Sequence, residues 1–160
     1  MGVSIQQNEV TNPSNPNVHS IEEFNALNGT IESLVVASGS CSDDSITELK
    51  INQFTQLRVL NIGHECFAYV REFEMIGMNA LKTVRIGTSC FLSANGVFRL
   101  RDCQRVRELR IGRFSFSDYS YCDMNNVPSL EVIEIGDLKE PSYNFFSASL
   151  ELRSGLEEGH

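Results

Sequence analysis

The feature that most constrains this chain is a seven-residue segment that returns at nearly even intervals. The four clear copies begin at residues 57, 81, 106 and 130 and read LRVLNIG, LKTVRIG, VRELRIG and LEVIEIG. A weaker copy, IESLVVA, begins at residue 31. Spacings of 24 to 26 residues are typical of solenoids, in which each repeat forms one coil and stacks on its neighbour. The sequence therefore predicts a solenoid of about five coils over residues 31–153.

Apolar residues recur at fixed positions of these segments. The fourth and sixth positions alternate with polar neighbours, as in a strand with one buried face. The fourth-position column is Leu34, Leu60, Val84, Leu109 and Ile133, and the sixth-position column is Val36, Ile62, Ile86, Ile111 and Ile135. We therefore expect one short strand in each copy, with these two columns turned inward.

A second apolar pair follows each segment, with its members two residues apart. The pairs are Leu49 and Ile51, Phe73 and Met75, Phe98 and Leu100, Cys122 and Met124, and Leu150 and Leu152. This spacing predicts a strand and not a helix. The expected fold is an all-β dominated solenoid with two parallel sheets.

Two further columns mark the turn after the first strand. The seventh position is Gly63, Gly87, Gly112 and Gly136 in the clear copies and Ala37 in the weak one. A backbone that turns with positive φ would explain the glycines. Four residues later comes an aromatic column of Phe67, Phe91 and Phe116, with Cys41 in the weak copy.

The two ends of the chain differ from the repeats. Ser20-Ile21-Glu22-Glu23 is a capping-box pattern, which predicts a short helix over 21–27 in an N-terminal cap spanning 19–30. Residues 1–18 lack periodicity and are expected to form a flexible arm, and residues 154–160 to be a tail left by cloning. We see no C-terminal cap. An exposed sheet edge there would favour an end-to-end homodimer through the last coil.

These residues resemble the leucine-rich repeat family over positions 31–153. The LxxLxI strand motif is matched at all four clear copies, whereas the family's usual asparagine is replaced by Glu65, Ser89, Phe114 and Leu138. The missing asparagine and the second strand are more similar to the BspA-like subgroup, known from bacterial and protist surface proteins. The resemblance implies a right-handed coil, β-structure on both faces, and a place at the cell surface or outside the cell.

Candidate chemistry is sparse. Cys66 and Cys90 occupy one column, and His64 lies two residues before Cys66. Zinc would need a fourth ligand that is not apparent, and a cysteine nucleophile would need a base held by a third group. The sequence therefore predicts no catalytic residues, no metal and no cofactor. An enzyme that uses these three side chains is kept as a third hypothesis.

Charge is distributed unevenly along the chain. Residues 1–57 carry a net charge of −6, residues 58–113 a net charge of +5, and residues 114–160 a net charge of −7. The total of −8 opposes binding to a nucleic acid, and no apolar run is long enough to span a membrane. The basic middle of the chain is the part expected to recognise a partner.

The outward positions two, three and five of the first strands, which we call the first-strand face, concentrate this positive charge. Arg85 and Arg110 should be lateral neighbours, and the repulsion between them would be retained if it served a docking site. A solvated face in which Glu108 neutralises one arginine is the alternative. The candidate partner-binding residues are the cations Arg58, Lys82, Arg85, Arg107 and Arg110, and the position-three residues Val59, Thr83 and Val132.

From these patterns we expect a non-catalytic module that binds a protein, in particular an acidic one, or a glycan surface through the first-strand face. The alternative is a structural or adhesive spacer within a larger surface protein. The compartment stays open, because five cysteines that cannot all pair favour a reducing interior while the family resemblance favours the cell surface.

Overall fold

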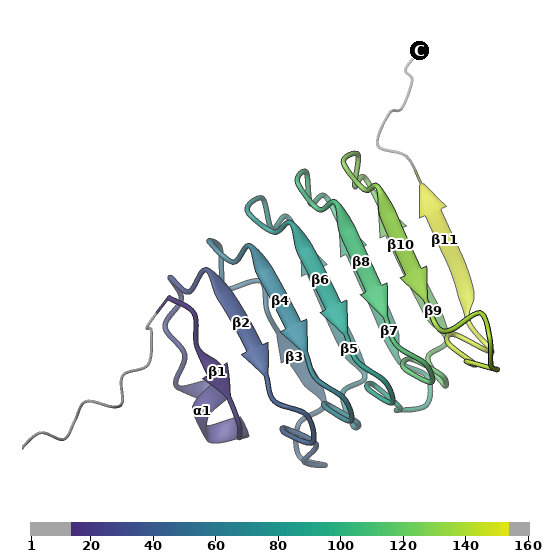
Figure 1. Cartoon of the computed structure of the whole chain (residues 1–160), viewed down its shortest axis with the longest axis horizontal. Coiled ribbons are helices and arrows are strands. Elements are labelled where there is room, and N and C mark those ends of the chain that lie inside the picture. Colours follow the sequence, from purple (N-terminus) through teal and green to yellow (C-terminus); the bar gives the residue numbers. More distant parts are fainter. Residues whose placement is uncertain (1–13, 154–160) are drawn as a thin grey trace, which may run out of the picture.

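The computed structural model describes residues 14–153. The expected tail at 154–160 and the first 13 residues of the expected arm lie outside this range. Within it the chain winds into a solenoid of two parallel sheets (Figure 1). The first sheet contains β1 (Asn17–Val18), β2 (Ser33–Val36), β4 (Val59–Ile62), β6 (Thr83–Ile86), β8 (Glu108–Ile111) and β10 (Val132–Ile135). The second contains β3 (Glu48–Lys50), β5 (Glu72–Ile76), β7 (Val97–Arg101), β9 (Tyr121–Asn125) and β11 (Ser149–Arg153).

The register of both sheets follows the columns seen in the sequence. Leu60 pairs with Val84 and Val84 with Leu109, so position four stacks on position four in successive coils. In the second sheet Phe73 pairs with Phe98, and Phe98 with Cys122. The predicted all-β solenoid of about five turns with two parallel sheets is confirmed.

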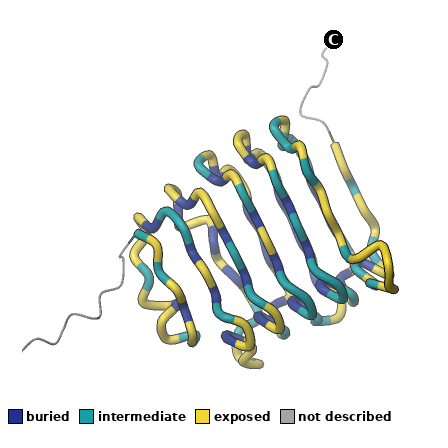
Figure 2. Tube along the Cα trace, viewed as in Figure 1, coloured by how far each residue is buried: buried dark blue, intermediate teal, exposed yellow. Residues whose placement is uncertain are grey.

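The core lies between the two sheets and runs the length of the solenoid. Inward residues of the middle coils are fully buried, while β11 at the last rung is mostly exposed (Figure 2). The aromatic column forms the spine of this core. Phe91 and Phe116 stack with their centroids 4.8 Å apart, and Phe116 and Phe145 follow at 4.9 Å. Phe145 therefore extends the predicted column into the last coil.

These phenylalanines also turn the chain. Phe67, Phe91 and Phe116 have φ values of 55°, 57° and 61°, which is a left-handed conformation that costs a non-glycine residue about 1–2 kcal/mol. The stacked rings offset this cost because each is buried against its neighbours in adjacent coils.

The glycine column has a different cause from the one predicted. Gly136 alone among the four has a positive φ, of 78°, so positive φ is the wrong explanation for the other three. A Cβ atom on Gly112 would lie 2.6 Å from the carbonyl carbon of Gly87, and a Cβ on Gly87 would lie 2.8 Å from that of Gly63. The column is glycine because the backbone of each coil approaches the preceding coil too closely for a side chain. Ala37 is tolerated in the first copy because only the two-residue β1 precedes it.

The N-terminal end of the solenoid is covered. Helix α1 (Ile21–Asn25) begins after Ser20, whose Oγ accepts a hydrogen bond from the Glu23 amide at 3.1 Å. Phe24 is buried from this helix and packs edge-on against Phe67 with centroids 5.9 Å apart. The expected helix is thus present but ends at residue 25. The arm expected through residue 18 is wrong at its last two residues, because β1 pairs with β2.

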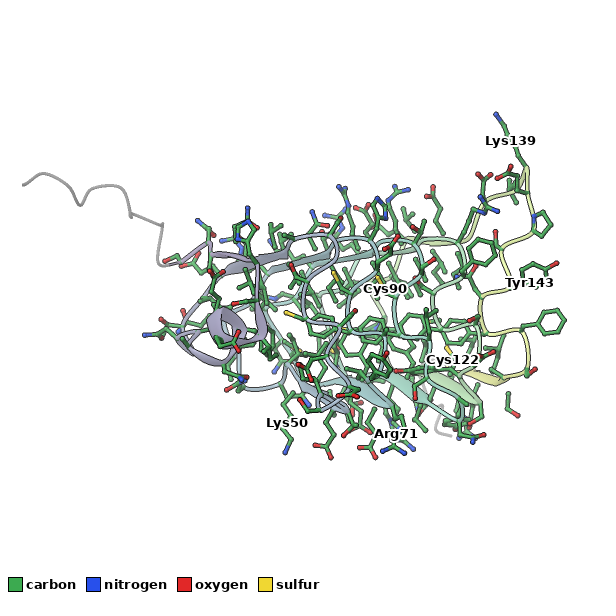
Figure 3. The ribbon with its side chains drawn as sticks, turned by 90° about the horizontal axis from the view of Figure 1, so that it is seen from below. Lys50, Arg71, Cys90, Cys122, Lys139 and Tyr143 are labelled. Atoms are coloured by element: carbon green, nitrogen blue, oxygen red, sulfur yellow. The ribbon has the colours of Figure 1, made fainter. Side chains whose placement is uncertain are left out.

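The C-terminal end is open. Ile133 and Ile135 of β10 and Leu150 and Leu152 of β11 are each more than 40% exposed, whereas their counterparts in the middle coils are buried. Tyr143, in the connection between β10 and β11, lies at the same end (Figure 3). Within residues 14–153, no helix has the length and apolar character needed to cross a bilayer.

Candidate functional site

The first-strand face brings the predicted cations onto adjacent rungs. Backbone hydrogen bonds from Lys82 to Arg58 and from Arg107 to Lys82, of 2.8 and 2.9 Å, place these three residues side by side across the start of the sheet. Farther along the strands Arg85 pairs directly with Arg110, as predicted. The face therefore has two columns of positive charge, one at position two and one at position five.

Acidic side chains neutralise the position-five column. Glu108 lies between the two arginines, at 3.2 Å from Arg85 and in direct contact with Arg110. Arg110 also reaches Glu134 on the next coil at 2.5 Å. The hydrogen bond from Arg110 lowers the pKa of the Glu108 carboxyl, so this bridge is ionised at neutral pH. The predicted repulsion between Arg85 and Arg110 is thus offset by Glu108 and Glu134, and little positive charge is left at position five for a partner.

The two ends of the position-two column are neutralised as well. Arg58 lies 3.7 Å from Glu32 on the preceding coil, and Arg107 lies 3.2 Å from both carboxylate oxygens of Glu131 on the following coil. Lys82, between them, is exposed and has no carboxylate within ion-pair distance in residues 14–153. Its lateral neighbours on both sides are arginines.

A shallow open depression adjoins Lys82, with a volume of about 570 Å³. Lys82, Arg105 and Arg107 supply its cationic side, and the segment Pro128–Glu131 forms the other wall. Arg105 is exposed and, within the described part of the chain, also has no carboxylate partner. Arg105 was not among the predicted residues because it lies in the loop before the repeat segment. The excess of basic residues over 99–113 was the available signal.

The apolar candidates form one row next to these cations. Val59, Thr83, Glu108 and Val132 pair in succession across β4, β6, β8 and β10. Val59 is exposed, while Thr83 and Val132 are half-buried. Glu108 interrupts the row, so Val59 and Thr83 are continuous with each other and Val132 stands apart.

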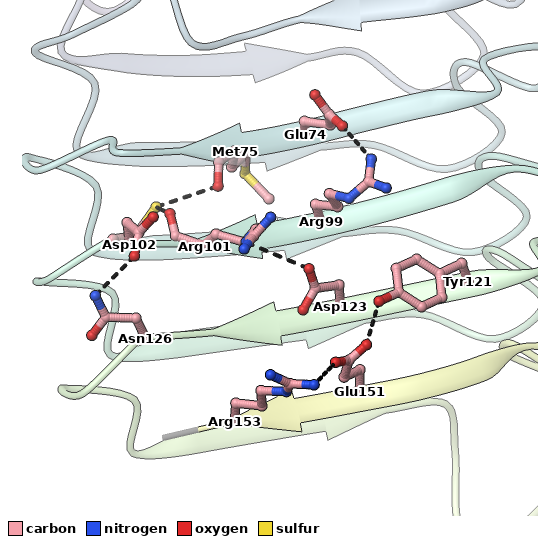
Figure 4. Close-up of polar contacts among 11 residues, drawn as sticks. Glu74, Met75, Arg99, Arg101, Asp102, Tyr121, Asp123, Asn126, Glu151 and Arg153 are labelled. Atoms are coloured by element: carbon pink, nitrogen blue, oxygen red, sulfur yellow. Dashed lines mark hydrogen bonds and ion pairs between the residues drawn. The ribbon is translucent and has the colours of Figure 1, made fainter. Parts of the chain in front are cut away.

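The outward side of the second sheet carries a polar network that the sequence analysis did not single out (Figure 4). Arg99 binds Glu74 at 2.6 Å, and Arg101 lies 3.5 Å from Asp123, which is buried. Farther along, Glu151 accepts a hydrogen bond from the Tyr121 hydroxyl and pairs with Arg153. Glu74, Arg99 and Asp123 alternate in charge across β5, β7 and β9, which helps to align these coils, whereas Glu151 lies beside the like-charged Asp123 and is balanced by Arg153 of its own strand.

The cysteine column proves to be a ladder of hydrogen-bond donors. The thiols of Cys66 and Cys90 donate to the carbonyls of Ala37 and Gly63, at 3.2 and 3.1 Å. Ser115 and Asn144 continue the pattern by donating to Gly87 and Gly112, at 2.6 and 2.7 Å. Each coil thus satisfies the position-seven carbonyl of the preceding coil, which explains the small polar residues in this column. Figure 3 shows Cys90 inside the solenoid.

The positions of Cys66, Cys90 and His64 do not support the hypothesis of an enzyme that uses these three side chains. The neighbouring Cys90 thiol lowers the pKa of Cys66, but the Cys66 side chain is fully buried. His64 does not act as its base, because its Nδ1 accepts the Thr88 amide at 2.9 Å. Within residues 14–153, no three His, Cys, Asp or Glu side chains are grouped to hold a metal ion.

The donor ladder predicts the response of Cys90 to substitution. Cys90→Ser keeps a donor for Gly63 and should change the free energy of unfolding by less than about 1 kcal/mol. Cys90→Val has a similar size but leaves the buried carbonyl unpaired, and should cost about 2 kcal/mol. Urea denaturation of both variants checks this. Equal losses would mean that the column selects for size and not for hydrogen bonding.

These observations define a two-sheet parallel β-solenoid with an open, partly cationic face. Comparison of the chain with family models, curated proteins and solved structures finds no match in any of the three. The face must therefore be interpreted from its own chemistry.

Proposed function

We propose that this chain is a non-catalytic recognition module that binds an acidic segment of another protein on the first-strand face, around Lys82 and Arg105. The observation that carries the proposal is the position of Lys82 between Arg58 and Arg107, with no carboxylate of residues 14–153 at ion-pair distance. Because Glu32 and Glu131 neutralise the two flanking arginines, Lys82 is left as the uncompensated charge between them, to which a carboxylate of a partner could bind.

The surroundings of Lys82 fit an extended acidic segment. The adjoining depression is lined by Lys82, Arg105 and Arg107, of which Arg107 is paired with Glu131, so a chain lying along the start of the sheet would meet two uncompensated cations, Lys82 and Arg105. The exposed Val59 and the neighbouring Thr83 lie beside them and offer contact to side chains between the acidic residues. The centre of the site thus moves from Arg85 and Arg110, which are occupied by Glu108 and Glu134, to the position-two column.

A fluorescent peptide rich in glutamate tests this site by anisotropy at about 50 mM and about 0.3 M salt, because screening separates electrostatic from apolar binding. The double variant Lys82→Glu, Arg105→Glu should bind the peptide about tenfold more weakly at the lower salt, or about 1.4 kcal/mol. Both side chains are exposed, so the fold should be retained, which circular dichroism checks.

The matched control is Lys50→Glu, Lys139→Glu, which changes the net charge equally. Lys50 projects from the second-sheet side and Lys139 from the loop at the C-terminal end (Figure 3). The control should retain most of the peptide affinity. If both double variants bind the peptide equally weakly, net charge alone accounts for the loss of affinity. That result would favour the spacer role over recognition at this face.

A further inference from the structure

The C-terminal end of the solenoid exposes apolar side chains that the rest of the fold buries. Leu150 and Leu152 are 61% and 60% exposed, whereas Phe98 and Leu100, their counterparts two coils earlier, are fully buried. On the first sheet, Ile133 and Ile135 are likewise exposed, whereas their counterparts Leu109 and Ile111 are buried. Leu138 and Phe146, in the connection between β10 and β11, are exposed as well. Among residues 14–153, no segment covers the apolar side chains of the core at this end.

The backbone at this end is also unpaired. β10 is bonded only to β8 and β11 only to β9, so within residues 14–153 each strand has one edge without a neighbouring strand. Free edges next to exposed apolar residues are the usual template for association with another chain. Within the described residues β1 and β3 are likewise edge strands at the other end, but there Phe24 of α1 covers the core.

We propose that two copies of this chain associate through their C-terminal ends about a twofold axis, each extending the two sheets of the other. A head-to-tail stack would place this apolar end against α1, whose first turn carries Glu22 and Glu23, and not against a second exposed core. With the twofold axis perpendicular to the sheets, β10 of one chain pairs antiparallel with β10 of the other, and the two β11 strands pair in the same way. In such a twofold interface both copies contribute the same surface, so no surface is left for a third copy and the assembly stops at a dimer.

Charge on β11 selects a register for the pairing. Inward residues must face inward residues, so the twofold axis passes through a residue and not between two. An axis at Glu151 would oppose two like carboxylates, which is unfavourable. An axis at Leu152 brings Leu152 against its own copy and Glu151 of each chain opposite Arg153 of the other. This second register joins apolar contact to two opposite-charge pairs.

Sedimentation equilibrium of the chain at about 0.15 M salt, where the acidity of the last coil is partly screened, should show a dimer that dissociates on dilution. Leu150→Lys should weaken the dimer at least about tenfold, since in this register Leu150 is the diagonal neighbour of Leu152 of the other copy and a charge there would border the apolar contact. Val35→Lys is the matched control on the outward side of β2, and should leave the dimer unchanged.

The register has its own test. Glu151→Arg or Arg153→Glu alone should weaken the dimer severalfold by creating like-charge pairs, and the double exchange should restore it. Each chain keeps its internal Glu–Arg pair in the double exchange but loses the hydrogen bond from Tyr121 to residue 151, so circular dichroism of every variant must show an unchanged fold. A monomer at every concentration, or a dimer that Leu150→Lys leaves intact, overturns the proposal. A double exchange that fails to restore association overturns the register at Leu152.

Discussion

Replacement of Phe91 by alanine should lower the free energy of unfolding by about 4 kcal/mol, which is the usual scale for removing a fully buried aromatic side chain. The Phe91 ring has no exposed surface and lies parallel to Phe73 and Phe116, with centroids 4.7 and 4.8 Å away. Phe116 belongs to the same aromatic column as Phe91, whereas Phe73 lies in β5, so the Phe91 ring links the column to the second sheet. A cavity at this point removes contacts from three coils at once.

Urea denaturation followed by circular dichroism measures this loss, and the slope of the transition shows whether unfolding stays cooperative. Phe146→Ala is the matched control, because that ring is 70% exposed, and it should change stability by less than about 0.5 kcal/mol. A loss below about 1 kcal/mol for Phe91→Ala would mean that neighbouring coils collapse into the space.

The inward columns could be predicted from the sequence because they depend only on periodicity. Alternation at positions four and six marks a strand with one buried face whatever the partner strand is. The repeat spacing then places Leu60 against Val84 without further information, as the register confirms. The same reasoning predicted that Arg85 and Arg110 would be neighbours.

The state of the outward face could not be predicted in the same way. Long charged side chains choose among several partners within reach, and the choice depends on atomic geometry. Glu108 was expected to neutralise one arginine, but it contacts both Arg85 and Arg110. The uncompensated charge consequently lies at Lys82 and Arg105, and Arg105 belongs to a loop outside the repeat columns.

The turn after the first strand shows that a column can be identified correctly and explained wrongly. The sequence indicates that position seven excludes side chains, but it does not distinguish a conformational reason from a steric one. In the structure Phe67, Phe91 and Phe116 are left-handed residues of this turn, as are Glu65, Ser89 and Phe114. Gly63, Gly87 and Gly112 lie outside that region. The two explanations predict different costs for adding a methyl group.

Gly112→Ala should destabilise the chain by about 3 kcal/mol, at the upper end of the range for overpacking. The added Cβ would lie 2.6 Å from the carbonyl carbon of Gly87, 2.7 Å from its oxygen and 2.8 Å from the amide nitrogen of Thr88. All three are backbone atoms, so no side chain can rotate away. Relief requires the fourth coil to separate from the third, which also lengthens the hydrogen bond from Gly112 to Ile86, now 2.8 Å.

Two other glycines separate the steric cause from the conformational one. Gly77 has a φ of 68° with open space around it, so Gly77→Ala should cost about 1 kcal/mol from backbone strain alone. Gly29 has only an ordinary contact at 3.7 Å and no positive φ, so Gly29→Ala should be neutral within about 0.5 kcal/mol. Thermal and urea unfolding of the three variants give the comparison. If Gly112→Ala costs no more than Gly77→Ala, the coils have room to move apart and the glycine column is not enforced by close stacking.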